Sequence, residues 1–229
     1  MNGAQEAPFS ITAMPEPIAR LYLVTPPIAE PQTFAPRLAE ACAAGAVAAV
    51  LLRLEAADER TLTKRVKALA PLAQERGAAV LVSAPGDADL AAVAARGGAD
   101  GVQVGAGPAL VRALRERLKE RSIGAGGIRS KDDAMMLGEA GADYLMFGEP
   151  RPDGSLPPVD AVAERAAWWA EIFETPCVAF APTLDAVERL AATGAEFVAL
   201  AEAVWDHPDG PAAAVRAALA ALPAPAEAR

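Results

Sequence analysis

The segment from Gly97 to Gly148 reads GGADGVQVGAGPALVRALRERLKERSIGAGGIRSKDDAMMLGEAGADYLMFG. It contains three short apolar runs, at 100–105, 122–126 and 143–148, and two stretches between them with apolar residues at three- and four-residue spacing. Short apolar runs that alternate with amphipathic helical patterns are typical of βα units in a parallel sheet. The segment therefore predicts three strands joined by two helices.

The same unit repeats on both sides of this segment, so that the whole chain carries one pattern. Further helical patterns occur at 62–76, 161–172 and 184–192. Candidate strands lie at 21–25, 49–54, 79–83, 100–105, 122–126, 143–148, 176–181 and 196–201. Eight units in about 200 residues predict a single-domain (β/α)₈ barrel, a TIM barrel, over residues 18–222.

The alternative fold is a doubly wound open sheet, because periodicity does not show whether the first and last strands pair. The stretch LVTPPIAEP, which follows the first strand, lacks the glycine fingerprint of a dinucleotide-binding sheet, and this favours the barrel. Residues 1–17 and 223–229 carry no periodicity and are expected to be a loose N-terminal extension and a loose C-terminal tail.

Composition narrows the function classes. The chain has 229 residues, 53% of them hydrophobic, and a formal net charge of −9, which disfavours nucleic acid and anionic membranes as partners. Cys42 and Cys177 stand alone, so we expect buried thiols rather than a disulfide or a zinc site. With neither an export leader nor an apolar run long enough to cross a membrane, the expected location is cytoplasmic.

Ligands of a (β/α)₈ barrel bind at the carboxyl ends of its strands, so the loops after the strands hold the candidate site residues. The loop after the fifth strand offers an anion site in which glycine N–H groups, an arginine and a helix N-terminus meet a phosphate. The expected contacts are Gly124, Gly126, Gly127, Arg129 and Ser130, with the N–H groups of Gly126 and Gly127 free. Alternatively, Ser130 only caps the helix, with Asp133 completing a capping box.

Three other strand ends carry polar candidates. Arg53 interrupts an apolar strand, so it binds a ligand phosphate or pairs with an acid of a neighbouring strand. Glu149 follows Gly148 at the end of the sixth strand, where it is placed to accept a proton or to form an ion pair with Arg151 or Arg129. Gln103 adds a neutral amide from the fourth strand.

Two further features have ordinary explanations. His207, the single histidine, lies near a helix start and is expected to be a solvated loop residue. Trp168 and Trp169 lie on a predicted helix, where at least one ring must face outward, which indicates packing or a homodimer contact.

From residue 20 to about 218, the chain resembles thiamine phosphate synthase, a family of (β/α)₈ enzymes. The resemblance is carried, in order, by RLYLVT (20–25), LLRLE (51–55), ADGVQVG (99–105), IGAGG (123–127), GADYLMFGEP (141–150) and GAEFVALAEAV (194–204). It implies a Mg²⁺-dependent reaction that joins an aminopyrimidine methyl diphosphate to a thiazole phosphate and expels diphosphate. Arg53 matches the family's arginine on the second strand.

The chain departs from the family pattern where the resemblance implies metal and diphosphate ligands. The metal aspartates fall on Ala84 and Pro108, so no Mg²⁺ site with two protein carboxylates is expected unless Glu55, Asp87 or Asp89 replaces them. The family's glutamine and lysine on the second strand are replaced by Leu51 and Glu55, and the asparagine and glutamine beside its metal aspartates by Ser83 and Ala106. The threonines and lysine of its thiazole-phosphate loop are replaced by RPDGS (151–155), and its phosphate-binding Gly-Gly pair by Ala181–Pro182.

The glycines at strand ends are nevertheless retained, namely Gly105, Gly124 and Gly148, which suggests that a ligand still enters. The favoured interpretation is a divergent paralogue that binds a phosphorylated small molecule at the barrel mouth, with weak or no synthase activity, with Arg53 and Glu149 as the catalytic candidates and without a predicted cofactor. The alternatives are an active synthase, which would need Mg²⁺, and a structural subunit that uses the tryptophan helix as an interface.

Overall fold

The computed structural model describes residues 19–105 and 107–223. The expected loose segment at 1–17, residues 224–229 of the expected tail, and Ala106 lie outside the described residues. No helix in the described ranges is both long enough and apolar enough to cross a membrane.

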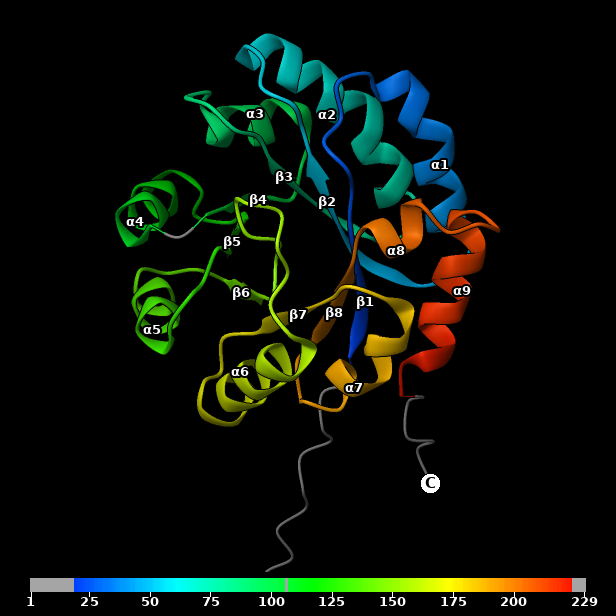
Figure 1. Ribbon diagram of the computed structural model, residues 1–229. Helices are drawn as coiled ribbons and strands as arrows, with labels where there is room; N and C mark the ends of the chain where they lie inside the picture. Colours follow the sequence, from blue (N-terminus) through cyan, green and yellow to red (C-terminus); the bar gives the residue numbers. More distant parts are fainter. Residues whose placement is uncertain (1–18, 106, 224–229) are drawn as a thin grey trace, which may run out of the picture.

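Eight parallel strands form a closed barrel in chain order, and β8 is hydrogen-bonded to β1 (Figure 1). This pairing confirms the barrel and decides against an open sheet. Every strand lies within two residues of its predicted range. The strands are β1 (Arg20–Val24), β2 (Val47–Arg53), β3 (Ala79–Ser83), β4 (Gly101–Val104), β5 (Ser122–Ala125), β6 (Tyr144–Phe147), β7 (Cys177–Ala181) and β8 (Phe197–Leu200).

Helices follow the strands and form the outer layer (Figure 1). The helix predicted at 184–192 divides into a 3₁₀ turn, η1 (Leu184–Ala186), and the short α7 (Val187–Ala191). The other helices are α1 (Pro31–Ala43), α2 (Glu59–Gln74), α3 (Leu90–Gly97), α4 (Pro108–Arg117), α5 (Lys131–Glu139), α6 (Val159–Ile172), α8 (Glu202–Trp205) and α9 (Pro211–Ala221).

The strands are buried on both faces, which explains why they read as continuous apolar runs. Side chains alternate along each strand, so one set fills the barrel and the other packs against the helices. The inner set includes Tyr22, Leu51, Leu81, Met146 and Phe180. The outer set forms the larger of the two apolar clusters.

An acidic residue at the start of three strands ties each one to the strand before it. In each case the carboxylate accepts a hydrogen bond from a backbone N–H near the start of the preceding strand. The pairs are Asp100 with Val80 (2.7 Å), Asp143 with Ile123 (2.6 Å) and Glu196 with Cys177 (2.8 Å).

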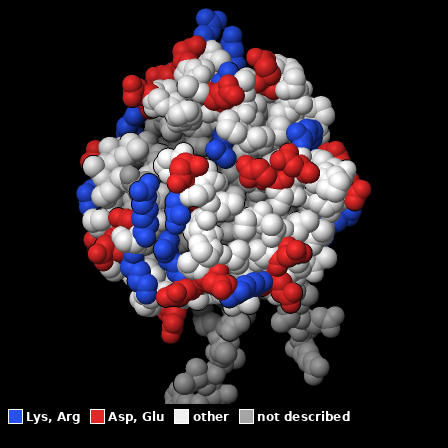
Figure 2. All heavy atoms as spheres, viewed as in Figure 1, with Lys and Arg blue, Asp and Glu red and all other residues white. Residues whose placement is uncertain are grey.

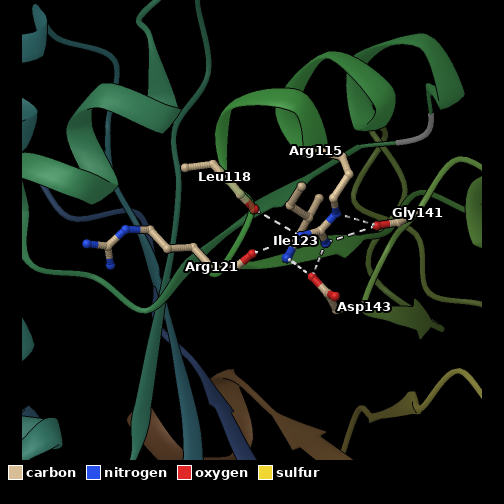
Figure 3. Close-up of polar contacts among 6 residues, drawn as sticks. All are labelled: Arg115, Leu118, Arg121, Ile123, Gly141 and Asp143. Carbon is tan, nitrogen blue, oxygen red and sulfur yellow. Dashed lines mark hydrogen bonds and ion pairs between the residues drawn. The ribbon is translucent and has the colours of Figure 1, made fainter.

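Arg115 of α4 reinforces the joint at Asp143. Its guanidinium donates to the carbonyl oxygens of Leu118, Arg121 and Gly141 and to the Asp143 carboxylate (Figure 3). The N–O distances are 2.9 Å to Leu118 and 3.0 Å to Gly141. Arg115 thus satisfies carbonyl groups in the loops that follow α4 and α5, where the helices offer no further donors.

We expect Arg115→Ala to lower the free energy of unfolding by about 1.5 to 3 kcal/mol, the usual worth of hydrogen bonds to a charged group. Urea denaturation would measure it. Arg112→Ala, on an exposed position of the same helix, is the matched control and should change the free energy by less than about 0.5 kcal/mol. Equal effects of the two substitutions would contradict the bracing role of Arg115.

Candidate functional site

A cavity of about 1180 Å³ opens at the carboxyl ends of β1 to β4. Its walls are Pro27 and residues 53–56, 83–90 and 103–105, together with Leu110, Leu114 and Arg117 of α4. This is the end of a (β/α)₈ barrel at which ligands bind.

Arg53 lies at the end of β2 and lines this cavity. It is half-buried, and its backbone N–H donates to the Thr25 hydroxyl at 3.0 Å. The ion pairs found among the described residues do not include Arg53. The acidic group on which it acts is Glu149, whose pKa the charge of Arg53 lowers without an ion pair between them.

Gln103 of β4 also lines the cavity, with only 4% of its surface exposed. Its Nε2 donates to Oε1 of Glu149 at 3.4 Å. Within the described part of the chain, the buried Oε1 of Gln103 has no hydrogen-bond partner. A buried acceptor without a donor is uncommon in folded proteins.

Glu149 follows β6 and lies against the loop after β5. Its Oε2 accepts the Gly127 N–H at 2.7 Å. The residue keeps some accessible surface, but protein atoms surround its carboxyl group, and this burial raises its pKa. The hydrogen bonds from Gly127 and Gln103 and the charge of Arg53 lower the pKa, though by less. The predicted ion pair with Arg129 or Arg151 does not form, because backbone and amide donors are nearer.

This environment makes stability depend on pH. A carboxyl whose pKa is raised on folding destabilises the fold when it ionises, so its cost appears as the pH rises above the ordinary value of 4.5. We expect Glu149→Gln to be more stable than the unmodified chain at about pH 7.5, with the difference shrinking toward about pH 4. Urea denaturation at both pH values tests this, with the exposed Glu139→Gln of α5 as control. A difference that is the same at both pH values would contradict it.

The loop after β5 does not offer the free donors expected from the sequence. The Gly126 N–H donates to the Val104 carbonyl at 2.9 Å, and the Gly127 N–H is taken by Glu149. The expectation that both groups are free was wrong. Both partners come from other parts of the fold. The backbone pairing of β5 with β4 continues for one residue past the end of β5, and the Glu149 carboxylate comes from the loop after β6.

Ser130 caps α5 in a complete capping box. The Ser130 hydroxyl accepts the Asp133 N–H at 3.0 Å, and the Asp133 carboxylate accepts the N–H groups of Ser130 at 2.9 Å and Arg129 at 3.1 Å. Arg129 and Ser130 are exposed and do not line the cavity. The capping explanation accounts for Ser130, and Arg129 joins the box through its backbone N–H.

The glycines of the barrel mouth make room for the chain's own side chains. A Cβ at Gly126 would lie 1.8 Å from the Glu149 carboxylate, and one at Gly124 would lie 2.1 Å from Gln103 Oε1 and from Tyr144 Cζ. Gly148 has a φ of 97°, which favours glycine. Among the retained strand-end glycines, only Gly105 borders the cavity, so retention of the others needs no ligand.

The described residues do not fit a magnesium ion. Glu55 and Asp87 line the cavity but are exposed, and the Asp89 carboxylate is taken by the Ala92 N–H at 3.1 Å and by Arg117 at 2.5 Å. No group of three metal-ligating side chains occurs in the described ranges. We therefore assign no chemical step to a metal ion.

Two polar pairs near the site have no obvious signal in the sequence. One is the Asp89–Arg117 ion pair at the cavity wall. The other joins the hydroxyl groups of Tyr22 and Tyr144 at 2.9 Å inside the barrel, where burial raises the pKa of both tyrosines. Tyr22 and Tyr144 are the two tyrosines of the chain. Their positions in predicted strands are the one sequence feature that could have suggested a buried pair.

The remaining sequence candidates lie away from the cavity. The ring of Trp169 is buried and stacks on Phe173 with centroids 4.0 Å apart, while Trp168 is half-buried with the Lys131 ammonium 4.6 Å from its ring. His207 lies in a loop, where its Nδ1 accepts the Asp209 N–H. Figure 2 shows Lys and Arg side chains gathered mainly on the side of α5 and α6, with acidic groups spread over the rest of that face.

Comparison with known proteins identifies similar sequences over most of the chain. A family described as thiamine monophosphate synthase matches residues 21–204. A thiamine-phosphate synthase of Rhodospirillum centenum is 43% identical over 204 residues, which cover 86% of this chain and 94% of the relative. One of Hyphomonas neptunium is 40% identical over 217 residues, covering 90% and 95%.

Solved structures agree on the fold. A thiamine phosphate pyrophosphorylase from Pyrococcus furiosus superposes with a TM-score of 0.70 at 24% identity, covering 88% of this chain and 94% of that one. A 3-hexulose-6-phosphate synthase reaches the same TM-score, 0.70, at 16% identity, covering 89% and 100%. At these identities the likeness shows the fold alone.

Proposed function

Because this chain belongs to the thiamine monophosphate synthase family, we propose that it forms thiamine phosphate from an aminopyrimidine methyl diphosphate and a thiazole phosphate, slowly, with diphosphate as the leaving group. The names of the relatives at 43% and 40% identity support this reaction. We assign it to the cavity at the carboxyl ends of β1 to β4.

Arg53 is the observation that carries the proposal. It is a half-buried cation in the cavity wall, outside the ion pairs of the described residues. A partly desolvated charge outside an ion pair is costly, and an anionic ligand would offset that cost more than the Glu149 carboxyl, on which Arg53 acts without an ion pair. Arg53 would hold the diphosphate and stabilise the negative charge that develops as it leaves.

The low rate follows from the charges around Arg53. Glu55 lines the same cavity, and the guanidinium of Arg117 is engaged by Asp89. A carboxylate about 4 Å from a phosphate oxygen would oppose it by roughly 4 kcal/mol at an effective dielectric constant of 20. Since Ala84 and Pro108 bring no metal ligand, the leaving group depends on few cations.

The loop after β5 remains a proposed second phosphate contact. Gly127 and Arg129 would supply it, but the phosphate would have to replace the Glu149 carboxylate at the Gly127 N–H. Glu149 thus occupies the position that the phosphate would take at this N–H.

A second candidate function is binding of a phosphorylated small molecule without synthase turnover. It is favoured by the absence of metal-ligating side chains at Ala84 and Pro108.

The deciding experiment incubates the purified full chain with both substrates, with and without Mg²⁺, and detects thiamine phosphate by mass. We expect product that requires both substrates and forms more slowly than about 1 per second. Absence of product, with calorimetric binding of either substrate, would replace the synthase by the binding function. Absence of both product and binding would remove both functions and leave a structural subunit.

A further inference from the structure

A cation and a buried carboxyl face the same space inside the mouth of the barrel. Leu51 of β2 belongs to the inner apolar cluster, and Arg53, two residues further along the strand, points to the same side. Gln103 of β4 lines the same cavity as Arg53, and its Nε2 donates to Glu149 Oε1 at 3.4 Å. The Gln103 amide therefore lies beside the carboxyl at the wall of the space that Arg53 enters.

The charge of Arg53 acts on Glu149 across a largely apolar interior, where charges are weakly screened. Burial raises the pKa of the Glu149 carboxyl, and the charge of Arg53 is among the influences that lower it. Tyr22 of β1 and Tyr144 of β6 also face this carboxyl, but burial raises the pKa of both hydroxyl groups and keeps them neutral. Among the described residues, Arg53 is thus the charged group that influences the ionisation of Glu149.

An anion bound to Arg53 would change this balance. Its negative charge offsets the positive charge that favours the ionised carboxyl, so Glu149 would take up a proton more readily. Linkage is reciprocal, so the same anion binds more tightly at a pH at which the carboxyl can be protonated. Anion and carboxyl need not touch for this coupling.

The Gln103 amide can accommodate the added proton. With Nε2 donating to Glu149, the buried Oε1 of Gln103 has no donor among the described residues. A reversed amide would let Oε1 accept the proton of a neutral carboxyl and would turn Nε2 toward the Tyr144 hydroxyl. That hydroxyl is close, because the Cβ position of Gly124 lies 2.1 Å from Gln103 Oε1 and 2.2 Å from the Tyr144 hydroxyl oxygen. Protonation of Glu149 would thus give the unpaired oxygen a donor.

We propose that Arg53 and Glu149 form a proton-linked pair, in which an anion that binds Arg53 is taken up together with a proton on the Glu149 carboxyl. Gln103 is a positioning residue that hydrogen-bonds this carboxyl in either protonation state. The linkage regulates the cavity of the proposed function, and its importance for a diphosphate rests on that function. The linkage itself requires only an anion at Arg53.

The test uses sulfate as the probe, because sulfate stays a dianion near neutral pH and takes up no proton of its own. Carbon-13 NMR of the side-chain carboxyl groups follows the full chain as the pH is varied, in sodium sulfate and in sodium chloride of equal ionic strength. The signal of Glu149 is the one that Glu149→Gln lacks. We expect sulfate to lower the ionisation constant of Glu149 by about tenfold, and to bind about tenfold more tightly at about pH 5.5 than at about pH 8.

Three variants separate the pair from a general effect of charge. Arg53→Ala should lower the ionisation constant of Glu149 in chloride and abolish the further effect of sulfate. Arg53→Gln, which is closer in size, repeats this measurement if Arg53→Ala does not fold. Glu149→Gln should remove most of the pH dependence of sulfate binding. Arg60→Ala, at an exposed position of α2, is the matched control and should respond to sulfate as the unmodified chain does.

Three results would overturn the linkage: no binding of sulfate, binding that leaves the ionisation of Glu149 unchanged, or a sulfate effect that persists in a folded Arg53 variant. The last result would place the anion at another site. Thiamine phosphate formation without the linkage would refute the linkage alone. Linkage without thiamine phosphate formation would refute the proposed synthase and leave the pair intact.

Discussion

Replacing Gly101 with alanine is expected to lower the free energy of unfolding by about 3 kcal/mol, at the upper end of the usual cost of overpacking a core. The added Cβ would lie 2.1 Å from the Ser122 carbonyl oxygen and 2.7 Å from Leu81 Cδ1. Leu81 can shift, but the Ser122 carbonyl belongs to the backbone of β5, which pairs with β4 at this level. Relief therefore requires the two strands to separate inside a closed barrel.

Gly105→Ala is the matched control, because it follows the same strand and a Cβ there meets nothing within 4 Å. It should change the free energy of unfolding by less than about 0.5 kcal/mol. Urea denaturation of both variants measures the contrast. If Gly101→Ala accumulates only as insoluble protein while Gly105→Ala folds, the result has the expected direction. Equal stability of the two variants would show that β4 and β5 separate at little cost.

Arg53→Ala is expected to lower kcat/KM for thiamine phosphate formation by about a hundredfold, in the range measured when one group that stabilises developing charge is removed. Few cations serve the leaving group in the proposed site, so the loss of this one should have a large effect. Arg53→Lys keeps a positive charge without the planar fork of donors and should recover part of the rate.

Arg60→Ala is the control for this substitution, since Arg60 is exposed on the neighbouring helix α2. It should leave kcat/KM within about twofold of the unmodified chain. Equal rates for Arg53→Ala and Arg60→Ala would show that the diphosphate is held elsewhere, and the loop after β5 would then be the next region to test.

The strands and helices of the barrel could be predicted from the sequence because they follow local rules. A strand buried on both faces must be apolar throughout, and each helix must present an apolar stripe, so both elements appear directly in the order of residues. The helix after β7 was the least well predicted. Its pattern spans 184–192, but the segment begins as a 3₁₀ turn, a difference of backbone pitch that apolar spacing does not reveal.

The loop after β5 shows where local rules were insufficient. Glycines beside an arginine and a helix start are consistent with an anion site, yet the donors are taken by Val104 and Glu149, which lie far from this loop in the sequence. Gly126 is required because Glu149 lies against it, with only 1.8 Å available for a Cβ. A glycine that serves a distant side chain and a glycine that serves a ligand look the same in one sequence.

The sequence by itself determined the eight βα units, the barrel class and the family, since periodic burial and ordered motifs are properties of the chain's residue order. Only the tertiary structure decided which polar groups of the mouth are satisfied. It showed that Glu149 occupies the Gly127 N–H, that Gln103 keeps an unpaired oxygen and that Arg53 lacks an ion-pair partner among the described residues. The physical reason is that hydrogen bonds and ion pairs depend on distances of a few ångströms between different strands, and these distances are set only when the barrel closes.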